Sequence, residues 1–259
     1  MAARIGAWYV AIVHERVTSR TGANAMREPS FAEILEVSTA RCRAMDAPLE
    51  VRLAAFADVV RELSPEFTAI VERMVLRLVE SGAGLAAPDI GEPMPSFLLP
   101  DHNGHLISLE RLLENGPLAI AMHRGHWCPY CRISASALAA TSDAVRACGG
   151  QIVAITPELQ IFNSRLRDDA AASYPVLTDL DNAYALETNV AIWVGEEKKQ
   201  AMSAAGWDIS RFHGNDAWIL PIPATFVVGT DGLVKARYVN PDYRTRMPIE
   251  PILAALKDA

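Results

Sequence analysis

The sequence predicts an α/β protein in which helices cover the faces of a central sheet, preceded by an extension made of helices alone. Up to about residue 82, apolar residues recur at helical spacing, whereas after residue 95 short apolar strands alternate with helical stretches. A segment rich in Gly and Pro at 84–95 separates the two parts. We therefore expect an N-terminal helical extension at 1–90 and an α/β domain at 91–259.

The extension is expected to contain three helices. Ser30 and Glu33 form a capping-box pattern at the start of the first helix. The second helix covers 48–62, and the third begins with Ser64 as N-cap, has Pro65 at its first position and ends near Gly82. The apolar stripes of these helices need a covering surface, which is either a second copy of the chain in a homodimer or the chain's own sheet.

The α/β domain is expected to begin with a hairpin, because two short apolar runs flank a turn signal at 101–104. The continuously apolar run at 117–123 predicts a buried strand. The predicted elements are, in order, strands at 97–99 and 106–108, a helix at 109–113, a strand at 117–123, a helix at 129–148, a strand at 151–155, a helix that begins with Thr156 and Pro157, a strand at 174–177, a strand–turn–strand unit at 224–239 and a helix at 248–257.

Composition excludes several classes of protein. Of the 259 residues, 51% are hydrophobic and 21% are charged, which excludes a disordered or collagen-like chain. The formal net charge is -7, so we expect no nucleic-acid partner. No apolar run approaches the roughly 20 residues that span a bilayer, so we expect no membrane partner. The apolar stretch at 7–13 is too short for a secretory signal, which predicts a cytoplasmic protein with residues 1–25 as a loosely attached arm.

Two cysteines lie where the strand at 117–123 gives way to the helix at 129–148. The connecting residues are Arg124-Gly125-His126-Trp127-Cys128-Pro129-Tyr130-Cys131. A thiolate at Cys128 would meet the free N–H groups and the positive dipole end of the first helical turn, which lower a thiol pKa. Cys131 lies one turn further along the same helix face, where it can close a disulfide. The pattern predicts a redox dithiol.

Other residues of this motif have expected roles as neighbours of the site. Arg124 and His126 add positive charge beside Cys128, and Pro129 fits the first helical position because its missing N–H is not needed there. Trp127 is expected either to shield the thiol or to pack in the core, and Tyr130 to lie partly exposed at the rim.

A structural metal site is the alternative for the Cys-x-x-Cys pair, with His123 and His126 as further ligands. Because the sequence has no second Cys-x-x-Cys pair, we expect no metal. Cys42 and Cys148 are expected to be small buried hydrophobes.

Outside the motif, charged residues are expected to have structural roles. Glu158 is expected in the first turn of a helix, where an acid is favoured. Residues 196–199 are interpreted as a solvated helix face, 179–182 as a turn, and 213–216 as a loop that could border the site.

These residues carry a resemblance to a known family. Residues 91–256 resemble the alkyl hydroperoxide reductase/thiol-specific antioxidant family, and more narrowly its peroxiredoxin-like branch with an Arg-Gly-x-Trp-Cys-Pro-Tyr-Cys turn. The matching segments are 91–97, 113–118, 124–131, 221–228 and 231–232. The resemblance implies a thioredoxin-like fold with a mixed central sheet, peroxide or disulfide chemistry at Cys128, a thiol reductant such as thioredoxin or glutathione, and no cofactor. It also implies a cis-proline at Pro223, beside the Cys-x-x-Cys turn.

The motif departs from the family pattern Pro-x-x-x-Thr-x-x-Cys, because Ala121 and Gly125 stand at the Pro and Thr positions. The resemblance therefore leaves two enzymatic activities open. The first is a peroxidase that uses Cys128 as nucleophile, Cys131 as resolving thiol and Arg124 to stabilise the thiolate and the polarised peroxide. The second is a thioredoxin-like disulfide oxidoreductase without significant peroxidase activity. A metal- or redox-sensing binding protein is the third hypothesis.

Overall fold

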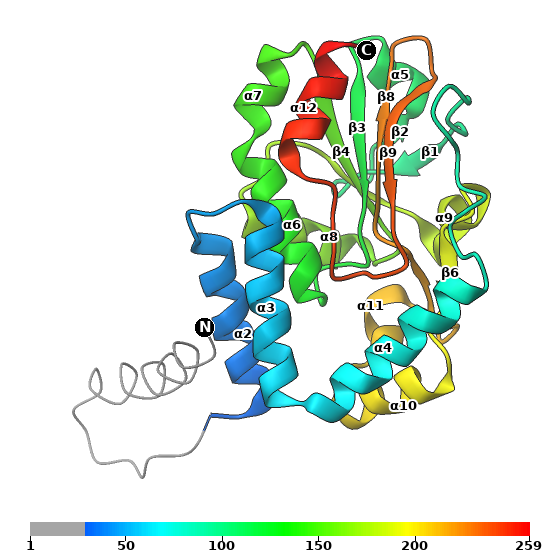
Figure 1. The fold of residues 1–259 in the computed structure, drawn as a ribbon. Coiled ribbons are helices and arrows are strands. Elements are labelled where there is room, and N and C mark those ends of the chain that lie inside the picture. The colour runs from blue at the N-terminus through cyan, green and yellow to red at the C-terminus, as the bar shows by residue number, and fades with distance from the viewer. Residues whose placement is uncertain (1–28) are drawn as a thin grey trace. The chain divides into compact units, whose positions relative to one another are not determined.

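The computed structural model describes residues 29–259, and expectations for residues 7–13 and 1–25 lie outside them (Figure 1). The chain divides into two compact units, Met1–Val37 and Ser38–Ala259. In the first unit, Ser30 and Glu33 form the expected capping box, since the Ser30 N–H donates to Glu33 Oε2 at 2.7 Å and the Glu33 N–H donates to Ser30 Oγ at 3.3 Å. Within residues 29–259, no helix is both long enough and apolar enough to span a bilayer.

The first three described helices are α2 (Phe31–Ala44), α3 (Leu49–Leu63) and α4 (Pro65–Glu80). The hydroxyl of Ser64 accepts a hydrogen bond from the Phe67 N–H, and Gly82 adopts a φ of +68° just after α4. The predicted start and end of this helix are therefore confirmed. Because α3 and α4 belong to the same compact unit as the sheet, the domain boundary near residue 90 stays a prediction.

A mixed five-stranded sheet forms the centre of the second unit. Its strand order is β5-β4-β3-β8-β9, with β3 parallel to β4, β4 parallel to β5, and β8 antiparallel to both β3 and β9. The strands are β3 (Leu118–Met122), β4 (Gln151–Thr156), β5 (Val176–Thr178), β8 (Ala224–Val228) and β9 (Val234–Val239). The fold class predicted from the sequence is confirmed.

Side chains of the central strands alternate between two apolar cores, as the pleat of a sheet requires. Leu118, Ile120 and Met122 of β3 enter one core, whereas Ala119 and Ala121 enter the other. Small residues on the second face let the helices approach the sheet closely. Both faces are therefore covered, which explains why β3 is apolar at every position.

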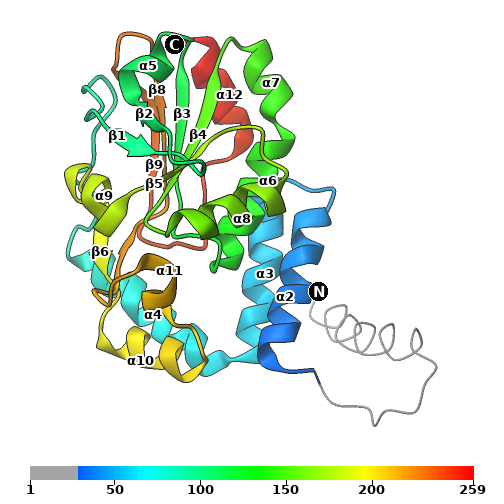
Figure 2. The same ribbon diagram turned by 180° about the vertical axis from the view of Figure 1, so that it is seen from behind.

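Helices cover one face of the sheet, and a hairpin with short helices covers the other (Figures 1 and 2). The first face carries α6 (Pro129–Ala140), α7 (Ser142–Ala147), α8 (Gln160–Ala170) and α12 (Ile249–Lys257). The second carries β1 (Leu98–Pro100), β2 (Leu106–Ser108), α5 (Leu109–Leu113) and α9 (Ala183–Glu187). The predicted hairpin is confirmed by the antiparallel register of β1 and β2.

Two predicted helix boundaries are wrong. The helix expected at 129–148 breaks at Thr141, whose hydroxyl donates to the Leu138 carbonyl at 2.8 Å and so competes with helical hydrogen bonding. The helix expected to begin at Thr156 and Pro157 begins at Gln160 instead. Thr156 is the last residue of β4 and pairs with Thr178, so sheet pairing overrides its capping propensity.

The segment between β5 and β8 contains elements that the sequence did not resolve. They are η1 (Leu180–Asn182), β6 (Ala191–Trp193), α10 (Glu196–Ala204), α11 (Ile209–His213) and β7 (Ile219–Pro221). Residues 180–182 form a short helical turn, and the buried Asp179 carboxylate accepts the N–H groups of Tyr184 and Ala185 at the start of α9. Strands β6 and β7 form a separate antiparallel pair outside the main sheet.

The expectation of a cis bond before Pro223 is wrong, because no peptide bond within the described residues is cis. A trans X–Pro bond is favoured intrinsically by about 0.5–1 kcal/mol, and the resemblance alone supplied the reason to expect otherwise. Strand register nevertheless places Pro223 near the motif. Ala121 pairs with Thr225, and continuing this antiparallel register places Pro223 opposite His123. Pro223 therefore lies at the end of β3, where the dithiol segment (residues 124–131) begins.

Phe226, fully buried in β8, tests the central core. We expect Phe226→Ala to lower the free energy of unfolding by about 3–5 kcal/mol, because it removes a large side chain and leaves a cavity. Urea denaturation would show this as a lower midpoint with an unchanged slope. Leu106→Ala is the control, since Leu106 is 61% exposed and should change little. Equal effects of the two substitutions would contradict this account of the core.

Candidate active site

The dithiol segment connects the carboxyl end of β3 to the start of α6. The N–H of His123 donates to the Ile155 carbonyl at 2.9 Å and so extends the pairing of β3 with β4 by one residue. The chain then turns at Gly125, whose φ of +129° is a conformation that residues with side chains rarely adopt. Cys128 is the N-cap of α6, and Pro129 occupies its first turn. Cys131 follows one turn later, as the spacing predicts.

Two arginines contact the two sulfurs. Arg124 donates from Nη2 to Cys128 Sγ at 3.2 Å and from its backbone N–H to Cys131 Sγ at 3.3 Å. Arg246, far away in the sequence, donates from Nη2 to Cys131 Sγ at 3.2 Å. The thiol of Cys128 hydrogen-bonds to the sulfur of Cys131. Both cysteines are free thiols with 0% exposure, so the pair and its cations are shut off from solvent.

The pair is arranged to hold one negative charge. Burial and the hydrogen bond with Cys131 raise the pKa of Cys128 well above its usual value, although Arg124 opposes them. Burial acts in the same direction on Cys131, but the Cys128 hydrogen bond and the charges of Arg246 and Arg124 outweigh it and lower the Cys131 pKa to about 5. In this conformation the charge rests on Cys131, with Cys128 as the donor, which differs from the expectation of a thiolate at Cys128. Because the thiols are coupled, the charge belongs to the pair.

Arg124 is held between two aromatic rings. Its guanidinium carbon lies 3.6 Å from the centre of the Tyr243 ring and 5.0 Å from that of Trp127. Burial disfavours its charge, but Cys128, Tyr243 and Cys131 outweigh this and raise the Arg124 pKa above its usual value. Arg124 therefore remains a cation inside the protein, beside the sulfur that the sequence assigns as nucleophile.

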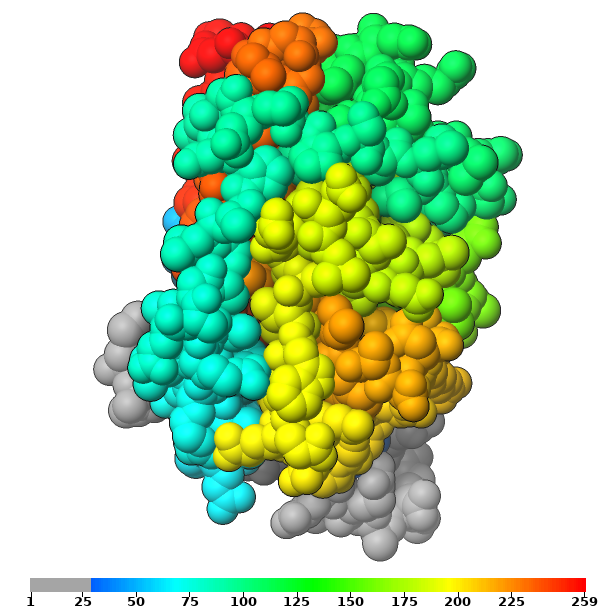
Figure 3. Space-filling model, turned by 90° about the vertical axis from the view of Figure 1, so that its right-hand side faces the viewer, coloured from blue at the N-terminus to red at the C-terminus, as the bar shows by residue number. Residues whose placement is uncertain are grey.

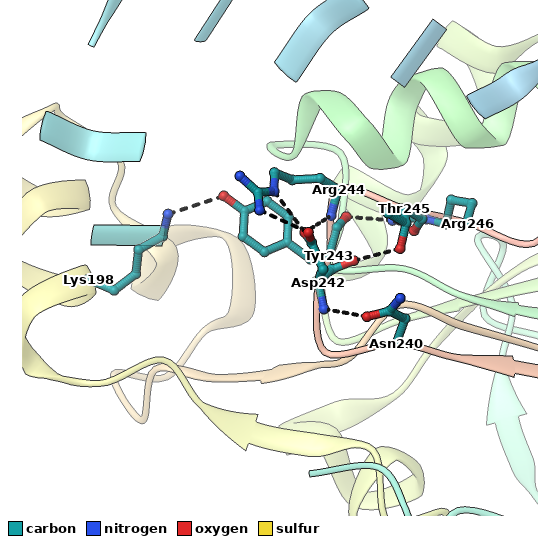
Figure 4. Close-up of polar contacts among 7 residues, drawn as sticks. All are labelled: Lys198, Asn240, Asp242, Tyr243, Arg244, Thr245 and Arg246. Atoms are coloured by element: carbon teal, nitrogen blue, oxygen red, sulfur yellow. Dashed lines mark hydrogen bonds and ion pairs between the residues drawn. The ribbon is translucent and has the colours of Figure 1, made fainter. Parts of the chain in front are cut away.

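The segment before α12 supplies Arg246 and Tyr243 (Figure 4). Arg246 donates from Nη1 to the carbonyls of Tyr243 and Thr245, both at 2.6 Å, which fixes the guanidinium. Asp242 pairs with Arg244 at 2.8 and 2.9 Å and so stabilises the same loop. Sequence reasoning missed Arg246, because nothing in the pattern of residues 240–247 relates them to a motif more than 100 residues earlier.

Aromatic side chains cover the dithiol. Phe56 of α3 packs edge-on against Tyr130 with ring centres 5.0 Å apart, and Tyr130 packs edge-on against Tyr243 at 5.5 Å. Tyr130 is only 5% exposed, so the expectation of a rim position is wrong. The cause is α3, which packs on α6 and covers the face that the motif alone leaves open.

Lys198 links α10 to the same cluster. It donates from Nζ to Tyr243 Oη at 3.2 Å and lies 3.7 Å from the centre of the Phe67 ring. The expectation of a solvated face is wrong for Lys198, which is 2% exposed, although Glu196 and Glu197 are exposed. Burial lowers the Lys198 pKa well below its usual value. An ion pair between Arg73 and Glu197 joins α4 to α10 at the surface, where Figure 3 shows α4 in cyan and α10 in yellow.

Glu158 lies on the other side of the dithiol segment. Its carboxyl is fully buried and accepts the His126 N–H at 2.6 Å and the Trp127 N–H at 3.5 Å. The expectation that Glu158 sits in a first helical turn is wrong, since α8 begins only at Gln160. The His126 ring points to a different carboxylate, with Nε2 2.7 Å from Asp169 Oδ2, and so does not contact the sulfurs through that nitrogen.

Two buried histidines flank the segment. His123 precedes Arg124, and neither of its ring nitrogens has a hydrogen-bond partner within the described residues. Burial lowers the pKa of His123 to about 3 and that of His213 to about 4. His213, the last residue of α11, hydrogen-bonds with the backbone of Arg124, so the first residue of the segment expected at 213–216 borders the site. Across residues 29–259, no three His, Cys, Asp or Glu side chains gather closely enough to hold a metal ion.

The remaining cysteines lie away from these contacts. Cys42 is buried as predicted, and burial raises its pKa to about 11. Cys148 is the C-cap of α7 and is only partly buried, so the expectation of a buried position holds for Cys42 but not for Cys148.

We predict that Arg246→Met raises the pKa of Cys131. A cation within hydrogen-bond distance of a thiolate lowers the thiol pKa by about 1–3 pH units, and the substitution removes it. Thiolate absorbance in the ultraviolet, followed against pH, measures the change. Arg244→Met is the matched control, since Arg244 pairs with Asp242 in the same loop. An unchanged titration in Arg246→Met would show that Arg246 does not stabilise the thiolate.

We also predict acid lability that originates in the buried histidines. His123 has a pKa of about 3 in the folded protein and 6.5 as its usual value. Between these values the unfolded chain binds one more proton, so stability falls as pH is lowered, by about 1.4 kcal/mol per pH unit. Urea denaturation between pH 7 and pH 4.5 should therefore show a shallower loss for His123→Gln than for the unsubstituted protein. Parallel curves would contradict the neutral state of His123.

Comparisons with known proteins agree with this architecture. The chain is similar to peroxidoxin BcpB from Mycobacterium tuberculosis, with 19% identity, a TM-score of 0.51, and coverage of 66% of this chain and 97% of that one. It is also similar to a mutant form of peroxiredoxin 6 from Arenicola marina, with 15% identity, a TM-score of 0.51, and coverage of 65% of this chain and 71% of that one. At these identities the likeness shows the fold. No curated protein matches the chain.

A family model gives the decisive comparison. The model described as AhpC/TSA family matches residues 90–237, which is more than half of the chain and includes the whole dithiol segment. The match and the fold of the neighbours support a thiol-dependent peroxidase, which is an oxidoreductase. With a mixed sheet of this order and a Cys-x-x-Cys pair at the start of α6, the protein belongs to the AhpC/TSA family.

Proposed function

We propose that this protein is a peroxiredoxin-like peroxidase that reduces hydrogen peroxide or organic hydroperoxides through a dithiol–disulfide cycle of Cys128 and Cys131. The observation that carries the proposal is the pair itself. Two hydrogen-bonded thiols lie at a helix N-terminus, and each sulfur receives a guanidinium N–H at 3.2 Å. Such an arrangement stabilises the thiolate, which is the nucleophilic form of cysteine.

The first step forms a bond between Cys128 Sγ and one peroxide oxygen. The S–O bond forms, the O–O bond breaks, and the proton that Cys128 shares with Cys131 passes to the departing oxygen. The departing oxygen leaves as water or an alcohol after it takes up a proton, and Cys128 becomes a sulfenic acid. Arg124 contacts Cys128 Sγ and is placed to stabilise both the thiolate and the negative charge that develops on the departing oxygen.

In the second step Cys131 resolves the sulfenic acid. Its thiolate attacks Cys128 Sγ, the S–S bond forms, and the sulfenic oxygen leaves as water once it is protonated. A thiol reductant of the thioredoxin or glutathione type then supplies two electrons and two protons that restore both thiols. Arg246 holds Cys131 ionised for this step. We place the cycle in the cytoplasm, where such reductants keep thiols reduced.

Burial of both sulfurs favours a small substrate. Because Cys128 is fully buried, a hydroperoxide reaches it only when a covering side chain such as Trp127 or Tyr130 moves. A folded protein disulfide would need a far larger opening. The second candidate, a thioredoxin-like disulfide oxidoreductase, is favoured by Gly125 at the family's Thr position. This activity requires that the reduced protein react faster with a model disulfide than with peroxide.

The test is peroxide consumption by single cysteine variants supplied with a thiol reductant. We expect Cys128→Ser to lose turnover entirely, because no other sulfur lies in contact with Arg124 Nη2 within the described residues. Cys131→Ser should still consume one equivalent of peroxide, and its Cys128 sulfenic acid should be trapped by a dimedone reagent. Cys42→Ser is the control and should retain full activity.

Retained turnover in Cys128→Ser would remove Cys128 from the role of nucleophile. Rates with hydrogen peroxide, an organic hydroperoxide and a model disulfide, measured on one sample, decide between the two enzymatic candidates. Metal analysis of the protein purified without chelator tests the third hypothesis, since stoichiometric zinc or copper would favour a sensing role.

A further inference from the structure

The buried carboxyl of Glu158 lies against Gly125 of the dithiol segment, in the space that a side chain at position 125 would fill. We propose that Glu158 is a positioning residue for Cys128: its carboxyl fills the space of a side chain at position 125, anchors the segment before Cys128, and while protonated allows the shared negative charge to reach Cys128. This inference rests on the proposed dithiol cycle. It adds a residue that lies outside the motif and to which the cycle assigns no role.

Geometry at Gly125 shows how closely the two residues fit. A Cβ at this position would lie 2.3 Å from Glu158 Cδ and 2.6 Å from both Cγ and Oε1. These separations are far below van der Waals contact, so a side chain at 125 and the carboxyl at 158 exclude each other. The departure from the family's Thr therefore has a structural counterpart, because a carboxyl from the segment between β4 and α8 occupies its place.

Glu158 is held firmly in this position. Its N–H donates to Thr156 Oγ1 at 3.1 Å, and Thr156 Oγ1 in turn donates to Asn163 Oδ1 at 2.6 Å. Asn163 donates from Nδ2 to Thr178 Oγ1 at 2.9 Å, and all four residues are buried. The ends of β4 and β5 and the first turns of α8 thus form a rigid support for the carboxyl.

The carboxyl satisfies two backbone N–H groups immediately before the nucleophile. Glu158 accepts from His126 at 2.6 Å and from Trp127 at 3.5 Å. Buried N–H groups that lose their acceptor cost free energy, so these bonds fix the approach of the chain to α6. Since Cys128 follows directly, the position of its sulfur depends on this anchor.

Glu158 also interacts electrostatically with Cys128. No cationic side chain among residues 29–259 pairs with Glu158. Burial raises the Glu158 pKa to about 8, although the hydrogen bonds from the His126 and Trp127 N–H groups lower it. A negative charge on Cys128 raises it further. Other titratable groups around it do not offer a neutralising charge. The His126 ring lies on Asp169, and His213 of α11 is held neutral by burial. At neutral pH the carboxyl is therefore protonated.

Ionisation of Glu158 would change where the shared charge lies. A carboxylate beside the segment repels negative charge on Cys128 and drives it towards Cys131, which has Arg246 as its own counter-ion. Above the Glu158 titration, Cys128 should therefore be less reactive than it would be beside a neutral carboxyl. A coupling of about half a pKa unit corresponds to about a threefold change in the ratio of the two reactivities.

The experiment measures that ratio directly. The reduced protein is treated briefly with iodoacetamide between pH 6.5 and pH 9.5, and mass spectrometry gives the yields at Cys128 and Cys131. Comparing the two sites in one sample cancels the pH dependence of the reagent and of any opening motion. Ionisation of Cys128 itself raises the Cys128/Cys131 ratio with pH in every variant, because the Cys128 pKa lies well above its usual value. Relative to the ratio in Glu158→Gln, we expect the ratio in the unsubstituted protein to fall about threefold across pH 8.

Asp179→Asn is the matched control, because Asp179 is a buried carboxyl that also accepts two backbone N–H groups but lies away from the dithiol. Its ratio should follow that of the unsubstituted protein and should fall about threefold relative to Glu158→Gln. Circular dichroism and thermal unfolding establish whether each variant is folded. If Glu158→Gln does not fold, infrared titration of the unsubstituted protein replaces it, and a protonated carboxyl band that persists above pH 7 supports the proposal.

Identical pH profiles of the ratio in the unsubstituted protein and in Glu158→Gln would overturn the role of Glu158. Neither readout needs peroxide turnover. Failure of the proposed peroxidase function would instead appear as undiminished peroxide consumption by Cys128→Ser, and this result does not depend on the alkylation ratio. The two failures are therefore distinguishable.

Discussion

One negative charge on a buried pair of sulfurs is the constraint on which this structure depends. An ionised group inside a protein is costly unless counter-charges and hydrogen bonds compensate it. Here Arg124 and Arg246 each contact one sulfur, and the Cys128 thiol donates to Cys131. Because both arginines are buried as well, neither cations nor sulfurs have solvent as an alternative partner. Loss of any one member leaves the charge less well compensated, so each of the four residues affects the ionisation of the pair.

Elements outside the Cys-x-x-Cys motif supply the side chains that enclose the two sulfurs and their arginines. Helix α3 supplies Phe56, which packs on Tyr130, and the segment before α12 supplies Tyr243, which lies against Arg124. Lys198 reaches the same tyrosine from α10. Excluding water strengthens every electrostatic contact at the dithiol, since the effective dielectric constant falls. The same cover disfavours a charge on Cys131, so the thiolate depends on the Cys128 hydrogen bond and on both arginines.

The sequence predicted what depends on local pattern and missed what depends on distant partners. The position of Cys128 at a helix start and the apolar strand β3 follow from residues within one segment, and both were predicted. Arg246 could not be found, because its contact with Cys131 spans 115 residues. Lys198 lies in a charged run that is solvated except where α10 meets Phe67 and Tyr243. Glu158 was placed in a helix because pairing of Thr156 with Thr178 is not visible locally.

Glu158 and Cys131 have pKa values displaced in opposite directions, and this has a consequence for stability. Glu158 changes from a usual 4.5 to about 8, so the folded protein binds the extra proton between these values and stability falls as pH rises. Cys131 changes from 9.0 to about 5, so the unfolded chain binds the extra proton and stability rises with pH. Between pH 5 and pH 8 the two contributions oppose each other. A protonated carboxyl and a thiolate can therefore lie close together with their contributions to the pH dependence of stability largely cancelling, which leaves the buried histidines as the main source of that dependence below pH 6.5.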